Sequence, residues 1–151
     1  MQIVEDDLSG PEIRALLTQH FAGMLAASPE GTCHFLDFEG LKSDDVTFWS
    51  VWQDGSLEGC GALKQLDDTH GEIKSMRVAD QFVGKGAGYA MLLHIIDEAK
   101  QRGYSCLSLE TGTGVEFEAA HRLYNRAGFS VCGPFANYEA TPFNHYMTME
   151  L

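Results

Sequence analysis

Three alternating glycines near the middle of the chain have the spacing that points most directly to ligand chemistry. Gly84, Gly86 and Gly88 follow a predicted strand at 73–78 and open a predicted helix. The apolar residues of this helix keep to one face: Leu92, Ile95, Ile96 and Ala99. Glycine lacks a Cβ, and the first N–H groups of a helix lack intrahelical acceptors, so this stretch predicts a seat for a phosphate or diphosphate. A tight turn with close helix–strand contact is the alternative interpretation.

The loop differs from the two common nucleotide-binding loops. A Walker loop requires Ser or Thr directly after Gly-Lys, whereas Lys85 is followed by Gly86. A dinucleotide-binding fold places its glycine turn in the first strand–helix unit, whereas this loop lies past the middle of the chain. Only Glu110, roughly 20 residues beyond the loop, fits the position of a ribose-binding acid. A nucleotide-binding α/β protein is therefore a third interpretation behind the two developed below.

Two motifs give the chain a resemblance to a known family. The run 83–88 (VGKGAG), with Leu92 and Leu93 behind it, resembles motif A of the GNAT superfamily of acyl-CoA-dependent N-acyltransferases. The run 120–129 (AHRLYNRAGF) resembles that family's Ala-x-x-Leu-Tyr-x-x-x-Gly-Phe segment. The order of the two motifs and of the predicted elements extends the resemblance over nearly the whole chain.

The resemblance implies that acetyl-CoA is the acyl donor and is held largely by backbone groups. Its extended pantetheine arm would pair with the edge of the strand before the glycine loop, as an added peptide strand would. Its diphosphate would bind the loop and the start of the helix. The implied cofactor contacts are Met76, Arg77, Val78, Val83, Gly84, Lys85, Gly86, Ala87, Gly88, Thr111, Ala120 and Tyr124.

The resemblance also implies two catalytic side chains. A protonated amine cannot attack a thioester, and Glu72 matches the family glutamates that take this proton directly or through water. Tyr124 matches the family tyrosine that protonates the departing thiolate. The backbone N–H of Val78 or a near neighbour would polarise the thioester carbonyl. A solvated Glu72 and a Tyr124 that serves only in packing are the alternatives.

Two positions depart from the family pattern. Val83 stands where Arg or Gln is usual, although Gln81 begins an alternative Gln-x-x-Gly-x-Gly frame. Phe117 stands where many members have an Asn that contacts the cofactor. Neither change removes the backbone cradle, but both bear on how tightly the cofactor binds.

Length and charge narrow the classes of function. A chain of 151 residues predicts one domain over 1–151, and its net charge of −12, without Lys or Arg clusters, argues against nucleic-acid binding. An acidic surface favours a cationic partner such as an amine. No apolar run approaches the ~20 residues that cross a bilayer, so no membrane partner is expected.

The cysteines and histidines bear on the cellular compartment and on whether the protein binds a metal. The cysteines form no Cys-x-x-Cys pair, and no secretory segment precedes the first predicted strand, which predicts reduced thiols in a cytoplasmic protein. The histidines show no metal-ligand spacing, so no metal site is proposed.

The order of the predicted strands and helices indicates an α/β (α+β) fold. Its sheet is expected to be twisted and mixed but mostly antiparallel, and these elements must position the residues named above. Turns are predicted at Asp54-Gly55 and at His70-Gly71. The unit strand–helix–strand places 106–110 parallel to 73–78, and the resemblance implies that these two strands splay apart beside a β-bulge. Strands are predicted at 1–7, 46–52, 57–66, 72–78, 106–110, 129–132 and 146–150, and helices from Pro11 through Leu25, after Gly88, and at 116–126.

Two segments, 28–45 and 133–144, are predicted to wall the acceptor pocket, because loops carry specificity in such a fold. Acidic residues of the first segment would attract a cationic substrate: Glu30, Asp37, Glu39, Asp44 and Asp45. Four aromatic residues are candidates for the pocket lining: Trp49, Trp52, Tyr138 and Phe143. We therefore expect an N-acetyltransferase acting on a small-molecule or peptide amine, with a non-catalytic acyl-CoA-binding module as the alternative. The C-terminal strands are the surface on which a homodimer would form.

Overall fold

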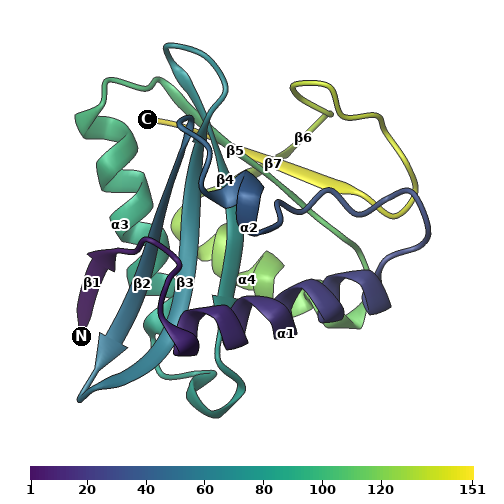
Figure 1. The fold of residues 1–151 in the computed structure, drawn as a ribbon. Helices are drawn as coiled ribbons and strands as arrows, with labels where there is room; N and C mark the ends of the chain where they lie inside the picture. The colour runs from purple at the N-terminus through teal and green to yellow at the C-terminus, as the bar shows by residue number, and fades with distance from the viewer.

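The computed structural model describes all residues 1–151, and its strands form a single sheet (Figure 1). The sheet has seven strands in the order β1-β2-β3-β4-β5-β7-β6. The strands are β1 (Gln2–Glu5), β2 (Val46–Gln53), β3 (Ser56–Gln65), β4 (His70–Val78), β5 (Cys106–Thr111), β6 (Ser130–Cys132) and β7 (His145–Glu150). Only β4 and β5 pair in parallel, so the predicted mixed sheet with one parallel pair is confirmed.

Helices cover both faces of the sheet. They are α1 (Pro11–Ala27), α2 (Phe38–Leu41), α3 (Ala87–Gln101) and α4 (Glu118–Ala127), with short 3-10 turns η1 (Asp80–Phe82) and η2 (Val115–Phe117). Figure 1 shows α1 on the near face and α3 and α4 on the far face. Each face therefore has its own apolar core, one built with α3 and α4 and one built with α1.

The first helix begins at Pro11 as predicted, but its last turns pack differently from the prediction. Gly10 is its N-cap and Pro11 occupies its first turn, where a missing N–H costs nothing. Ile13, Leu16 and Leu17 are buried against the sheet. Leu25 was predicted on the same face, but the residue is 61% exposed, and the core cluster under α1 holds no residue of the helix beyond Phe21.

The helix after the glycine loop confirms the periodicity argument. Its four predicted core residues are all buried, and each contributes to the larger core cluster: Leu92, Ile95, Ile96 and Ala99. Burying one large aliphatic side chain stabilises the fold by about 1.5–3 kcal/mol. This face anchors α3 on β3 and β4, so the start of α3 is held at a defined place beside the end of β4.

The turn predicted at His70-Gly71 is wrong, because both residues belong to β4. The turn lies at 67–69, where the Asp67 carboxylate accepts a hydrogen bond from the Thr69 N–H at 2.8 Å. Gly71 is needed within the strand for packing rather than for a turn. A Cβ there would lie 2.8 Å from Leu63 Cδ1 and 2.9 Å from Tyr104 Cε2.

The parallel strands separate at the middle of the sheet. Pairing between β4 and β5 extends from His70 to Ile73 on β4 and stops there, although β4 continues to Val78. Beside this point, β4 carries one extra residue opposite Gly61 of β3, and Ser75 adopts a positive φ of 56°. This is the predicted splay beside a β-bulge, and it leaves the second half of β4 without a partner on the β5 side.

We predict that Gly59→Ala destabilises the fold at this strand pair. The added Cβ would lie 2.6 Å from the Arg77 carbonyl oxygen, so the backbone of β3 or β4 must shift. We expect the free energy of unfolding in urea to fall by about 1–3 kcal/mol. Gly133→Ala is the control because a Cβ there meets nothing within 4 Å, and equal stabilities of the two variants would contradict this packing.

Candidate active site

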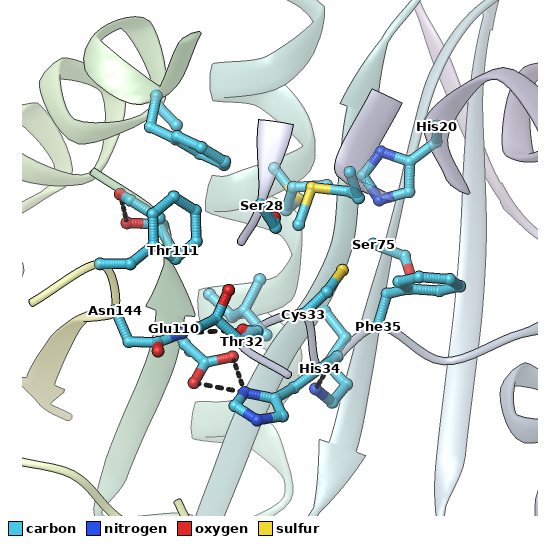
Figure 2. A pocket seen from close by; sticks show the side chains of 18 of the residues that line it. His20, Ser28, Thr32, Cys33, His34, Phe35, Ser75, Glu110, Thr111 and Asn144 are labelled. Atoms are coloured by element: carbon cyan, nitrogen blue, oxygen red, sulfur yellow. Dashed lines mark hydrogen bonds and ion pairs between the residues drawn. The ribbon is translucent and has the colours of Figure 1, made fainter. Parts of the chain in front are cut away.

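A cavity of about 120 Å³ lies where β4 and β5 separate (Figure 2). Residues 72–76 of β4 form one wall, and the end of β5 with α4 forms another. Segment 28–35 covers the cavity, and Phe143 and Asn144 contribute from the loop before β7. Both segments predicted to wall an acceptor pocket, 28–45 and 133–144, therefore reach the cavity.

Glu72 lies in this cavity rather than on the surface. Its residue is 1% exposed, and its Oε2 accepts a hydrogen bond of 2.7 Å from the Tyr138 hydroxyl. The same oxygen lies 3.1 Å from Lys74 Nζ. Its other oxygen, Oε1, has no hydrogen-bond partner in the protein, so one side of the carboxylate stays available.

Two residues from distant parts of the sequence contact Glu72: Lys74 on β4 and Tyr138 in the loop before β7. Lys74 Nζ donates to the Tyr138 hydroxyl at 2.9 Å and to the His34 carbonyl at 3.0 Å. Together with Glu72, these acceptors use all three of its protons. Burial and the adjacent Glu72 charge raise the pKa of Tyr138, so its hydroxyl remains a donor.

A second buried carboxylate, Glu110, faces the cavity from β5. Both of its oxygens lie 2.8 Å from His34 Nδ1, and the side chains of His34 and Glu110 are 34% and 8% exposed. Figure 2 shows this pair at the edge of the cavity. His34 Nε2 has no partner in the protein, so the ring can accept or donate a proton there.

Tyr124 reaches the cavity from α4 and is buried. Its ring packs edge-on against Phe129 at 5.7 Å between centroids. Burial raises the pKa of Tyr124, so its hydroxyl stays protonated at neutral pH. This hydroxyl has no hydrogen-bond partner within the protein, which leaves its proton free for a ligand.

The predicted site residues divide into two groups. One group lines the cavity: Glu72, Met76, Thr111, Ala120 and Tyr124. The other lies beyond it, at the end of β4 and in the glycine loop: Arg77, Val78, Val83, Gly84, Lys85, Gly86, Ala87 and Gly88. The second half of β4, which has no partner on the β5 side, runs from the first group toward the second.

The start of α3 has the properties that a diphosphate requires. Gly84 and Gly86 have positive φ values of 82° and 94°, and no side chain caps the helix. The N–H groups of Gly86, Ala87 and Gly88 donate to no acceptor in the protein. Gly88 also packs closely against β4, because a Cβ at this position would lie 3.2 Å from Val78 Cγ2. The helix start therefore combines free N–H donors with close contact to the strand.

Several sequence predictions about the cavity lining are wrong. Trp49 is buried in the core, and Trp52 bonds Ser50 through its Nε1, so neither lines the cavity. Phe143 does line it, and Tyr138 contacts Glu72. None of the acidic residues predicted to attract a substrate reaches it: Glu30, Asp37, Glu39, Asp44 and Asp45. The carboxylates in the cavity come from strands instead, because alternate residues of β4 and β5 point to the same face.

Sequence reasoning missed several residues that meet at the cavity. They are His20, Ser28, His34, Lys74 and Ser75, and Glu110 was considered only for a nucleotide. The available signal for Glu110 was the predicted parallel placement of 106–110 beside the strand that carries Glu72. In the structure Glu72 pairs with Ser108, and alternate residues share a face, so Glu110 lies on the same face as Glu72.

The parallel strands β4 and β5 separate, and helix α3 begins at the glycine loop after β4. This is the arrangement that the resemblance to acyl-CoA N-acyltransferases implies. The profile of the acetyltransferase (GNAT) family matches residues 11–129, and the chain belongs to this family. The predictions of an acyl-CoA-dependent acetyltransferase and of acetyl-CoA as its cosubstrate are thereby confirmed.

Relatives of similar length agree with this assignment. The N-acetyltransferase YsnE of Bacillus subtilis (strain 168) is 46% identical over 151 residues, with all of both chains covered. The N-acetyltransferase YedL of Escherichia coli (strain K12) is 46% identical over 149 residues, covering 99% of this chain and 94% of the relative.

A solved structure extends the similarity to the whole fold. A Klebsiella pneumoniae protein described as an acyl-CoA N-acyltransferase superposes with a TM-score of 0.80 at 26% identity, covering 99% of this chain and 97% of its own. No helix of the present chain has the length and apolar character needed to span a bilayer.

We predict that Lys74→Met destabilises the protein through Glu72. Removing the ammonium leaves the buried carboxylate without its cation, and the free energy of unfolding should fall by about 3–5 kcal/mol. Adding Glu72→Gln should recover much of that loss in a double-mutant cycle followed by urea unfolding. Lys100→Met, at an exposed position of α3, is the control, and strictly additive effects of Lys74→Met and Glu72→Gln would contradict the pairing.

Proposed function

We propose that this acetyltransferase moves the acetyl group of acetyl-CoA to a primary amine bound in the β4–β5 cavity, by direct attack in a ternary complex. The observation that carries the proposal is that Glu72 and Tyr124, from different elements, line the same cavity. One has a free carboxylate oxygen and the other a free hydroxyl proton. A base and an acid on one cavity are what acyl transfer to an amine requires.

The cosubstrate would be held along the second half of β4 and at the start of α3. Met76, Arg77 and Val78 offer backbone groups with no partner on the β5 side, which suits an extended chain with amides. Thr111 and Ala120 would border the same arm from β5 and α4. The diphosphate would bind the loop and first turn, which comprise Val83, Gly84, Lys85, Gly86, Ala87 and Gly88. When bound, acetyl-CoA supplies an activated thioester.

Each reacting proton has a place in this arrangement. Glu72 Oε1 would take the proton of the ammonium, directly or through water, while Oε2 remains held by Tyr138. The N–H of Val78 or a neighbour would donate to the thioester oxygen as charge develops on it. Tyr124 would protonate the sulfur that leaves, since its raised pKa keeps the proton on the hydroxyl until a thiolate forms. The second proton lost by the nitrogen as the amide forms would return to the Tyr124 oxygen, so the two protons of the ammonium end on Glu72 and, through Tyr124, on the sulfur.

The His34–Glu110 pair is a second candidate for the base. Glu110 fixes the His34 ring through Nδ1 at 2.8 Å and leaves Nε2 open, the geometry of an oriented imidazole base. Glu72 differs because one of its oxygens is already committed to Tyr138 and lies next to Lys74. The two candidates therefore make different predictions for single substitutions.

Location and assembly complete the proposal. We propose a cytoplasmic enzyme of one domain, supported by four free cysteines. We propose that a homodimer forms through the C-terminal strands, where β6 leaves an unpaired edge of the sheet.

We predict that Tyr124→Phe and Glu72→Gln each lower kcat by about 10²–10⁴-fold with little change in the KM for acetyl-CoA. Release of coenzyme A thiol in the presence of a panel of amines measures this loss. Retained activity in Glu72→Gln, together with its loss in His34→Gln, would transfer the base role to His34. Binding of acetyl-CoA without thiol release for any amine would support the non-catalytic module instead.

A further inference from the structure

Three residues that line the cavity each carry a buried polar atom without a hydrogen-bond partner. These atoms are His20 Nδ1, Ser28 Oγ and Ser75 Oγ. Figure 2 shows His20 and Ser75 across the cavity from Glu110 and Thr111. Leaving a buried polar group without a hydrogen-bond partner is unfavourable, so three such groups at one cavity indicate an occupant that bonds to them.

These three residues come from two elements, helix α1 with its C-cap and strand β4. His20 lies on α1 and is 7% exposed, and Ser28 is the C-cap of the same helix. Ser75 is the left-handed residue of the β4 bulge, with φ of 56°. A bulge re-aims a side chain relative to the regular alternation of a strand, and this bulge makes Ser75 a lining residue.

The charge state of this wall favours a neutral ligand group. Burial, and secondarily the charge of Arg77, lowers the pKa of His20 to about 4, so its imidazole is neutral at neutral pH. Among the lining residues, Lys74 has all its protons engaged and His34 is paired with Glu110. A buried carboxylate would therefore lack a free cation here, which makes its burial costly.

A hydroxyl and a neutral imidazole can each take part as donor or acceptor. A ligand hydroxyl or carboxamide has the same dual character, whereas an alkyl group can satisfy none of the three atoms. The cavity also holds the carboxylates of Glu110, across from His20 and Ser75, and of Glu72, three residues before Ser75 on β4. These carboxylates suit an ammonium or amine.

We propose that His20, Ser28 and Ser75 form an acceptor subsite that binds a neutral hydroxyl or carboxamide group of the amine substrate. The inference rests on the proposed function, because it places the reacting nitrogen on the Glu72 side. Amino alcohols and amino amides are then preferred to alkylamines of the same size and to amino acids. A cavity of about 120 Å³ admits only a small group beside the amine.

Two matched pairs of amines test the subsite. The first pair is 2-aminoethanol and propylamine, and the second is glycinamide and glycine. Each lost hydrogen bond of about 0.5–1.5 kcal/mol corresponds to a roughly 2–12-fold change. We expect kcat/KM to be about tenfold or more higher for the hydroxyl or carboxamide member, since more than one bond is involved.

Ser28→Ala and His20→Gln provide the variants. Ser28→Ala should reduce the preference for 2-aminoethanol by severalfold and leave propylamine within about twofold of the wild type. His20→Gln, which keeps a neutral donor and acceptor, should retain more of the preference than His20→Leu. Ser56→Ala, at an exposed position of β3 outside the cavity, is the control and should change neither substrate.

Equal kcat/KM for the members of each pair would overturn the subsite. A rise in the KM for acetyl-CoA in Ser28→Ala, with amine selectivity unchanged, would also overturn it by assigning these groups to the cofactor. If no amine is acetylated, the proposed function fails, and calorimetric binding of the same amines decides the subsite. Tighter binding of 2-aminoethanol that is lost in Ser28→Ala would support it, and equal binding of both amines would overturn it.

Discussion

The end of backbone pairing between β4 and β5 is the constraint on which the site depends. After Ile73 and Leu109 the two parallel strands share no further pairs, although both continue. Backbone N–H and C=O groups in a protein interior need partners, so an unpaired strand edge beside a cavity suits a ligand that carries amides. The bulge at Ser75 and the start of α3 both lie along this same edge. The opening in the sheet therefore sets the direction of the proposed cofactor and brings its reactive end to the cavity.

Buried charge in the cavity is arranged for chemistry more than for stability. Glu72 with Lys74, and Glu110 with His34, are pairs whose removal from water offsets much of their mutual attraction. Apolar residues would fill the same volume at less cost in free energy. The network instead leaves specific atoms free, including Glu72 Oε1 and the Tyr124 hydroxyl, while their neighbours are fixed. Perturbed and buried ionisable groups gathered in one cleft are typical of catalytic sites.

Local sequence signals predicted the elements and one end of the site. The spacing of the glycines predicted the start of α3, and the predicted helix at 116–126 corresponds to α4, which ends at Gly128 with φ of 106°. Tyr124 was predicted because it belongs to a motif, and Glu72 because it stands at the start of the strand that leads to the glycine loop. By contrast, His34 meets Glu110 across 76 positions and Tyr138 meets Glu72 across 66, distances that no periodicity spans. The turn assigned to His70-Gly71 failed for a related reason, since Gly71 is set by packing under Tyr104 rather than by local backbone preference.

A crystal structure of the protein with acetyl-CoA tests the central claim most directly. The account predicts the diphosphate on the N–H groups of Gly86, Ala87 and Gly88, the pantetheine arm along β4, and the thioester between Glu72 and Tyr124. Acetyl-CoA bound elsewhere, or density for it that leaves the opening between β4 and β5 empty, would contradict the account.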